Sequence, residues 1–127
     1  MDNYIATVTE AVTESNTAIS VGSGSLKVYA TPAMLALIEK AACKAIENAL
    51  NEGETSVGTL LNVKHLAATP VGMQVEATAE LLERDGRKLT FAVKAYDECG
   101  LIGEGTHERF IVHSEKFTEK TYSKLNK

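Results

Sequence analysis

Three side chains have the types that acyl-transfer chemistry requires, and they are Thr31, Glu39 and His65. A carboxylate serves as a general base or a nucleophile, an imidazole carries protons, and a hydroxyl holds or polarises a partner. No other constellation in the sequence offers this set, because it contains no G-x-S-x-G elbow, no Walker loop and no H-E-x-x-H motif. We therefore take these three residues as the candidates for catalysis.

Glu39 stands out because of the helix that must position it. Residues 31–50 predict one helix of about twenty residues, with Thr31 as its N-cap, Pro32 as its first residue and Gly53 as its stop. At about 100° per residue, Glu39 falls at the edge of the apolar arc and outside the polar stripe. The helix offers its charge no partner, because no Lys or Arg lies three or four positions away. We interpret Glu39 as a functional carboxylate. The alternatives are that its side chain reaches past the helix edge into water or pairs with a residue of another strand.

His65 belongs to the next segment, residues 58–65, which alternates like a strand. The face of this strand that should meet the core carries Thr59, Leu61, Val63 and His65. A lone histidine on such a face is more often structural, and Thr31 could be only a helix cap. Glu39 lies two helical turns, about 12 Å, from Thr31, so we expect both to border one crevice between helix and sheet.

The remaining pattern predicts the elements that surround this crevice. Residues 5–12 have β character, and from Thr55 onward apolar and polar residues alternate. Asp85-Gly86 and residues 98–100 mark two reversals. One short strand, one long helix and at least four long antiparallel strands leave no room for parallel crossovers. We predict an α+β domain with the hotdog fold, in which one highly twisted antiparallel sheet wraps one long helix.

Composition limits the classes of protein. The 127 residues, 44% of them hydrophobic, predict a single domain over 1–127 that needs no metal or disulfide, with 114–127 as a short helix or tail. A net charge of −4 argues against a nucleic-acid partner. The start, MDNYIATVTE, is no secretory signal and the longest apolar run, AMLALI, cannot span a bilayer, so we predict a cytoplasmic protein without a membrane partner. We expect free thiols at Cys43 and Cys99, the former buried. We also expect a flexible connection around Gly22.

Three separated segments resemble a known family. They are TPAMLALIEKAA, EGETSVGTLLNVKHLAATPVG and GEGTHERFIV, and their order and spacing agree across residues 28–112. They resemble the hotdog-fold acyl-CoA thioesterases, in particular the fluoroacetyl-CoA thioesterase-like group. The resemblance implies hydrolysis of a small acyl-CoA to the free acid and CoA, with CoA as part of the substrate and no other cofactor. It implies Thr31, Glu39 and His65 as the catalytic set, Gly58 as a backbone donor near the substrate carbonyl, and Arg109 as a contact in or near the site.

The resemblance also implies partners. Hotdog domains of this kind pair their sheets with the crevices at the subunit boundary, so we expect a homodimer or a dimer of dimers, with Leu37 touching other protein. Arg109, Lys64 and the lysines from 116 to 124 are candidates to receive the CoA phosphates. Fluoroacetyl-selective members carry lid phenylalanines ahead of the helix, whereas VGSGSLKVYA has none and Tyr29 is its only aromatic residue. The acyl group therefore stays open.

Two other functions fit the same fold. A non-catalytic hotdog module would bind an acyl-CoA or another small ligand and release no thiol. A hotdog enoyl-CoA hydratase or dehydratase would change the absorbance of an enoyl-CoA and release no thiol either; it suits a helix-borne Glu39 and a strand-borne His65 less well. Thiol release from acyl-CoA esters separates both from a thioesterase.

Overall fold

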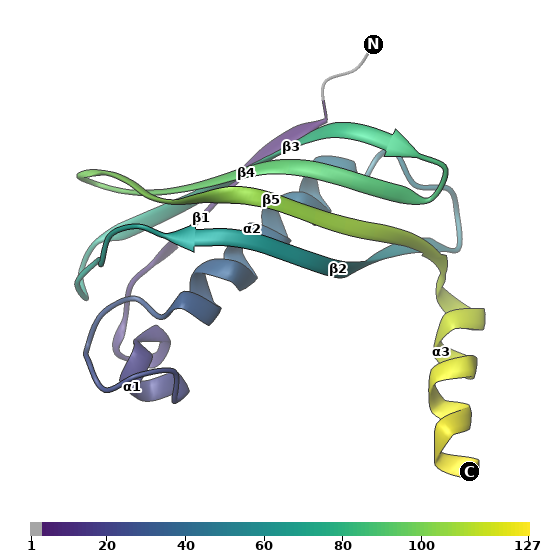
Figure 1. The fold of residues 1–127 in the computed structure, drawn as a ribbon, viewed down its shortest axis with the longest axis horizontal. Coiled ribbons are helices and arrows are strands. Elements are labelled where there is room, and N and C mark those ends of the chain that lie inside the picture. The colour runs from purple at the N-terminus through teal and green to yellow at the C-terminus, as the bar shows by residue number, and fades with distance from the viewer. Residues whose placement is uncertain (1–3) are drawn as a thin grey trace.

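A five-stranded, entirely antiparallel sheet arches over one long helix in the computed structural model, which describes residues 4–127 (Figure 1). The strands are β1 (Ile5–Ala11), β2 (Glu54–His65), β3 (Gln74–Asp85), β4 (Lys88–Asp97) and β5 (Gly100–His113). Their order in the sheet is β1-β3-β4-β5-β2, so β2 forms one edge. The predicted α+β arrangement of one helix against one antiparallel sheet is confirmed, and both predicted reversals join neighbouring strands.

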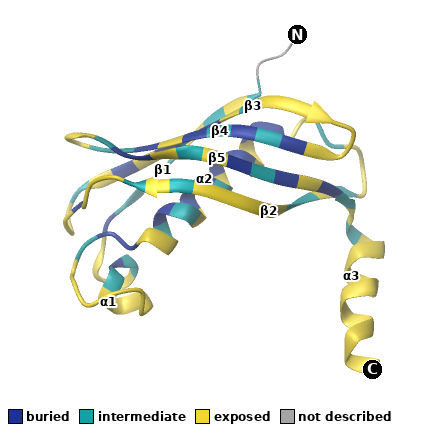
Figure 2. Ribbon diagram, in the orientation of Figure 1, coloured by how far each residue is buried: buried dark blue, intermediate teal, exposed yellow. Residues whose placement is uncertain are grey.

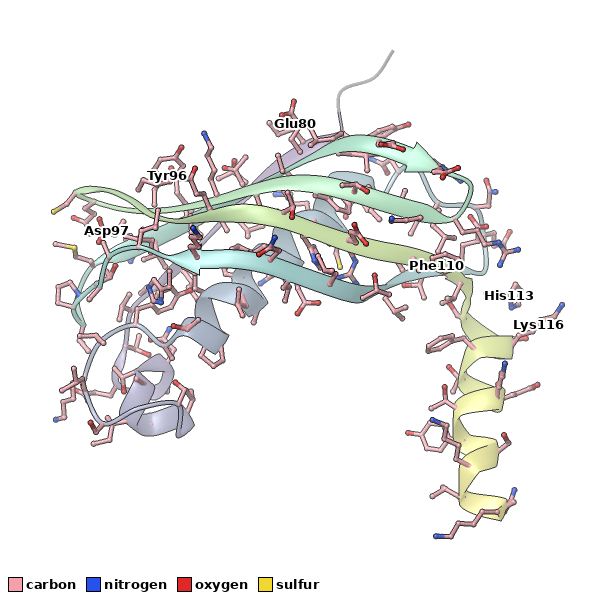
Figure 3. The ribbon with its side chains drawn as sticks, in the orientation of Figure 1. Glu80, Tyr96, Asp97, Phe110, His113 and Lys116 are labelled. Carbon is pink, nitrogen blue, oxygen red and sulfur yellow. The ribbon has the colours of Figure 1, made fainter. Side chains whose placement is uncertain are left out.

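Within residues 4–127, four shorter helices accompany the long helix α2 (Thr31–Ile46). They are η1 (Glu14–Asn16), α1 (Ala18–Val21), α3 (Ser114–Tyr122) and η2 (Ser123–Asn126). α1 occupies the segment in which we predicted only a flexible connection, and Gly22 ends it in the left-handed conformation, with φ of 82°. α3 extends away from the sheet at the end opposite α1 (Figure 1). Phe110, His113 and Lys116 are exposed where β5 passes into α3 (Figure 3).

The core lies between α2 and the inner face of the sheet, where Figure 2 shows the buried residues of α2, β4 and β5. The buried residues of α2 are Met34, Leu37, Ile38, Ala41, Ala42, Ala45 and Ile46. Leu37 is only 4% exposed, so the prediction that it touches other protein was wrong; it packs in its own core. Close packing favours a glycine at position 103, because a Cβ there would lie 2.8 Å from the sulfur of Met34 and the buried methionine would have to shift.

Both ends of α2 differ from the prediction. The N-cap is Ala30, which makes no side-chain cap, and Thr31 is already the first helical residue. The helix ends at Ile46 because the chain then tightens into i to i+3 hydrogen bonds, such as that from the N–H of Ala49 to the carbonyl of Ile46. Gly53 is not the helix stop; its φ of 83° belongs to the turn before β2. Cys43 is exposed on α2, so its predicted burial was also wrong.

A β-bulge divides β2 at Thr59. Gly58 pairs with Arg109 and Leu60 pairs with Glu108, which leaves Thr59 without a partner in the register. A bulge shifts the alternation of side chains by one residue. The predicted strand face was therefore wrong at Thr59, although Val63 packs against the core as expected.

Candidate active site

Thr31 and His65 form the first part of the candidate site. Thr31 opens α2 and His65 closes β2, and 2.7 Å separates Thr31 Oγ1 from His65 Nδ1. The hydroxyl is free for this contact because it does not cap the helix. Both residues line one open hollow with Tyr29 and Leu66. A hydroxyl and an imidazole in direct contact can exchange a proton.

The ring of His65 is arranged for proton exchange. Burial lowers the pKa of His65 below its ordinary value of 6.5, against an opposing effect of the Ala67 backbone. The ring is therefore neutral at pH 7. Its Nε2 atom is buried and has no hydrogen-bond partner among residues 4–127. A buried polar atom without a partner is unusual in folded proteins, so this nitrogen keeps an unused hydrogen-bonding capacity.

Glu39 and Arg109 form the second part. Arg109 NH1 donates to Glu39 Oε2 at 3.1 Å; the arginine side chain is 7% exposed and the glutamate side chain 40%. Ser56 anchors the guanidinium, because Arg109 Nε donates to its Oγ at 2.8 Å and NH2 donates to its carbonyl at 3.0 Å. Glu39 thus finds a partner on another strand, which was one of the alternatives that the sequence left open.

Gly58 lies directly beneath this carboxylate. It faces Arg109 in the strand register, and a Cβ added to it would lie 2.5 Å from Glu39 Oε2 and 3.3 Å from Arg109 NH1. A glycine is therefore needed for the carboxylate to approach the backbone of β2. Since the backbone stays bare here, a substrate carbonyl could approach it too.

Sequence reasoning missed two residues of this region. His107 is fully buried and touches Arg109, with 3.3 Å between its Nε2 and Arg109 NH1, and Ser56 anchors the same guanidinium. The sequence T-H-E-R held a signal for His107, because residues two apart on a strand share a face. Glu39, Ser56, His107 and Arg109 are called the Arg109 cluster below.

The single chain does not join the two parts. Thr31 and Glu39 are two turns apart on α2, about 12 Å, and they line separate hollows. We expected both to border one crevice, and within the chain they do not. Lys64 precedes His65 on β2, is exposed and alternates to the opposite face, away from both parts. Within residues 4–127, no three His, Cys, Asp or Glu side chains are grouped to hold a metal ion, and no helix is long and apolar enough to cross a membrane.

Comparison with known proteins adds independent findings. Residues 12–115 match the model of the family described as fluoroacetyl-CoA-specific thioesterase. The chain is 46% identical over 98 residues to the fluoroacetyl-CoA thioesterase of Streptantibioticus cattleyicolor, which covers 77% of this chain and 70% of that protein. A solved structure of a fluoroacetyl-CoA thioesterase matches with a TM-score of 0.91 at 37% identity, covering 98% of this chain and 96% of that one.

Two further solved structures bear on the fold. A thioesterase superfamily member from Thermus thermophilus matches with a TM-score of 0.88 at 32% identity, over 99% of this chain and 93% of that one. A hot-dog-like protein from Thermanaerovibrio acidaminovorans, at 23% identity, matches with a TM-score of 0.84 over 94% of this chain and 89% of that one. The predicted hotdog fold is therefore confirmed.

Proposed function

The chain belongs to the fluoroacetyl-CoA-specific thioesterase family, and we propose that its active site combines Thr31 and His65 of one copy with Glu39 of a second copy. It is an acyl-CoA thioesterase that hydrolyses a small acyl-CoA. The observation that carries the proposal is the hydrogen bond of 2.7 Å between Thr31 and His65, with Glu39 two helical turns away. Hydroxyl and imidazole are in contact, but the carboxylate must come from elsewhere.

The reaction adds water across the thioester and yields the free acid and CoA thiol. Glu39 acts on the carbonyl carbon, either as general base for the attacking water or as the nucleophile of a transient mixed anhydride. The neutral His65 shuttles the proton and delivers it to the departing thiolate sulfur. Thr31 holds the imidazole through its Nδ1 atom. The Gly58 N–H donates to the developing oxyanion, a contact worth about 3 kcal/mol in acyl-transfer enzymes.

A homodimer is the arrangement that would unite these groups. β2 is an edge strand, and α2 packs mainly on β1 and β3, which leaves the inner side of β2 largely uncovered. Leu61, which points to that side, is 36% exposed, and an uncovered edge strand is a template for pairing with another chain. Antiparallel pairing of two β2 strands about a twofold axis would bring the His65 end of one copy toward Gly58 and Glu39 of the other. Two such dimers could associate further.

The remaining expectations belong to the same proposal. The reaction uses no cofactor apart from the CoA of its substrate and takes place in the cytoplasm. The exposed Lys64 and the exposed lysines 116 to 124 are the candidates to receive the CoA phosphates. Arg109 is not, because its side chain is 7% exposed and its guanidinium is bound by Glu39 and Ser56. We do not propose fluoroacetyl selectivity, because the segment ahead of α2, VGSGSLKVYA, contains no phenylalanine and Tyr29 is its only aromatic residue.

Release of free CoA from acetyl-, propionyl- and longer acyl-CoA esters, measured by thiol trapping, tests the proposal. Glu39→Gln and His65→Ala should each lose most activity, whereas Glu47→Gln, an exposed change at the C-cap of the same helix, should not. The two inactive variants are then co-refolded in equal amounts. About half of the dimers would be mixed, each with one intact site, so about a quarter of the activity should return.

Two outcomes would contradict the proposal. If Glu39→Gln and His65→Ala both hydrolyse their best ester as fast as the unmodified protein, the catalytic assignment is wrong. If mass spectrometry detects mixed dimers and no activity returns, the groups do not come from different copies.

A further inference from the structure

His107 is a buried imidazole to which the proposed reaction gives no part. It lies on the inner face of β5 with an exposed fraction of 0%, and its ring stacks on Phe91 of β4, with centroids 5.9 Å apart and planes at 28°. Its Nδ1 lies 2.8 Å from the carbonyl oxygen of Leu60. A carbonyl oxygen only accepts hydrogen bonds, so Nδ1 must carry a proton.

The second ring nitrogen faces a group that only donates. His107 Nε2 lies 3.3 Å from Arg109 NH1, and a guanidinium has no acceptor. Nε2 must therefore be unprotonated, which makes the ring neutral. The charged groups that face the ring are Arg109 on its own strand and Glu39 on α2; its contacts on β2 and β4, the Leu60 carbonyl and Phe91, carry no charge. Burial, more than the charge of Arg109, lowers the pKa of His107, which agrees with this state.

We propose that His107 is a positioning residue that orients Arg109, and through it the carboxylate of Glu39 above Gly58. Arg109 NH1 donates both to His107 Nε2 and to Glu39 Oε2, while Ser56 holds Nε and NH2. His107 is thus the fixed acceptor on the same nitrogen that binds the carboxylate. The inference rests on the proposed role of Glu39.

Two substitutions separate orientation from packing. His107→Phe keeps an aromatic ring on Phe91 but removes the acceptor, and should lower kcat about tenfold or more with a smaller change in KM, because misplaced catalytic groups are costly. His107→Gln supplies a carbonyl oxygen as a new acceptor and should recover most of the loss. His113→Phe, at the exposed end of β5 (Figure 3), is the matched control and should leave kcat unchanged. If the Phe and Gln variants are equally impaired, or neither is, the proposal fails.

Nitrogen NMR tests the hydrogen-bond roles without any substrate. Long-range proton–nitrogen correlation at pH 7 should show the His107 ring protonated on Nδ1 alone, with the signals assigned by their absence in His107→Gln. An Nε2-protonated or charged ring would overturn the proposal even if Glu39 proves catalytic. Conversely, if Glu39→Gln is fully active while the NMR result holds and His107→Phe still lowers kcat, the role of Glu39 is wrong and that of His107 toward Arg109 stands.

Discussion

The two parts of the candidate site differ in how completely their polar atoms are satisfied. In the Arg109 cluster, guanidinium, imidazole, hydroxyl and carboxylate bond to one another across α2, β2 and β5. In the Thr31–His65 pair, one ring nitrogen is bonded and the other is buried without a partner in residues 4–127. A network with its hydrogen bonds made is rigid, whereas an unpartnered nitrogen is ready for a proton or a ligand. The contrast indicates a fixed anchor and a reactive end.

Removal of the reactive imidazole should have the largest effect. His65→Ala should lower kcat about 100-fold or more, because general acid–base groups contribute at least that much. Thr31→Val should lower it less, since the ring remains. Thiol-release kinetics measures both changes, with circular dichroism as the control for folding. Equal activity in His65→Ala and the unmodified protein would remove the distinction between the two parts.

A methyl group under the carboxylate should disturb the anchor with little effect on folding. Gly58→Ala places a Cβ 2.5 Å from Glu39 Oε2, so the flexible glutamate must move. We expect kcat to fall about tenfold, because displacement of a catalytic group by about 1 Å can cost more than that. Thr55→Ala, an exposed change on the same strand, is the control. Unchanged kcat in Gly58→Ala would show that the carboxylate position does not matter.

Removal of the Arg109 guanidinium should lower the free energy of unfolding more than removal of the Thr31 hydroxyl does. Arg109→Met leaves Ser56, His107 and Glu39 without their shared donor, and we expect the free energy of unfolding to fall by about 2 kcal/mol. The cost stays below that of a fully buried ion pair because the Glu39 side chain is 40% exposed. Thr31→Val, by contrast, should change stability by less than about 1 kcal/mol. Urea denaturation measures both; the reverse order would mean that Thr31–His65 is the structural part.

Mild acid should affect both parts. Burial lowers the pKa of His65 and of His107 below 6.5, so below that pH the unfolded chain binds protons that the folded chain does not. Stability should therefore be complete above pH 6.5 and decline as pH falls toward the lowered folded-state pKa values. Thermal unfolding between pH 7.5 and 5 measures the decline in stability. His107→Phe should remove the part of this decline that is due to protonation of His107. If the midpoint temperature of unfolding rises as the pH falls toward 5, the two rings are not neutral in the folded protein.

Local periodicity was sufficient to predict the fold. The strands, the helix and both reversals followed from residue spacing because each depends on neighbours within a few positions. The ends of α2 did not follow from the sequence. At the N-terminal end, a threonine can either cap the helix or bond to another side chain, and only the position of His65 on β2 shows that Thr31 does the second. Leu37 was misjudged because it falls on the otherwise polar side of the helix, whereas the fold buries it in the core.

Residue type was enough to choose candidate site residues, but it did not give their arrangement. Thr31, Glu39 and His65 were chosen for their chemistry, and the structure joins only Thr31 to His65. The contact between Glu39 and Arg109 spans 70 positions, so no local pattern encodes it. The roles of these residues remain predictions until variants are assayed.

The bulge at Thr59 has a consequence for how such a site can change. Before it, even-numbered Ser56 and Gly58 face the helix; after it, odd-numbered Val63 and His65 do. A regular strand could not turn both Gly58 and His65 to the same side, since seven positions separate them. Deletion of Thr59 would turn the side chains of one half of β2 to the opposite face. Gly58 and His65 would then point to different sides and the site would be lost, although no residue that carries its chemistry had changed. A single-residue deletion at Thr59 is thus enough to separate Gly58 from His65 across the two faces of the strand.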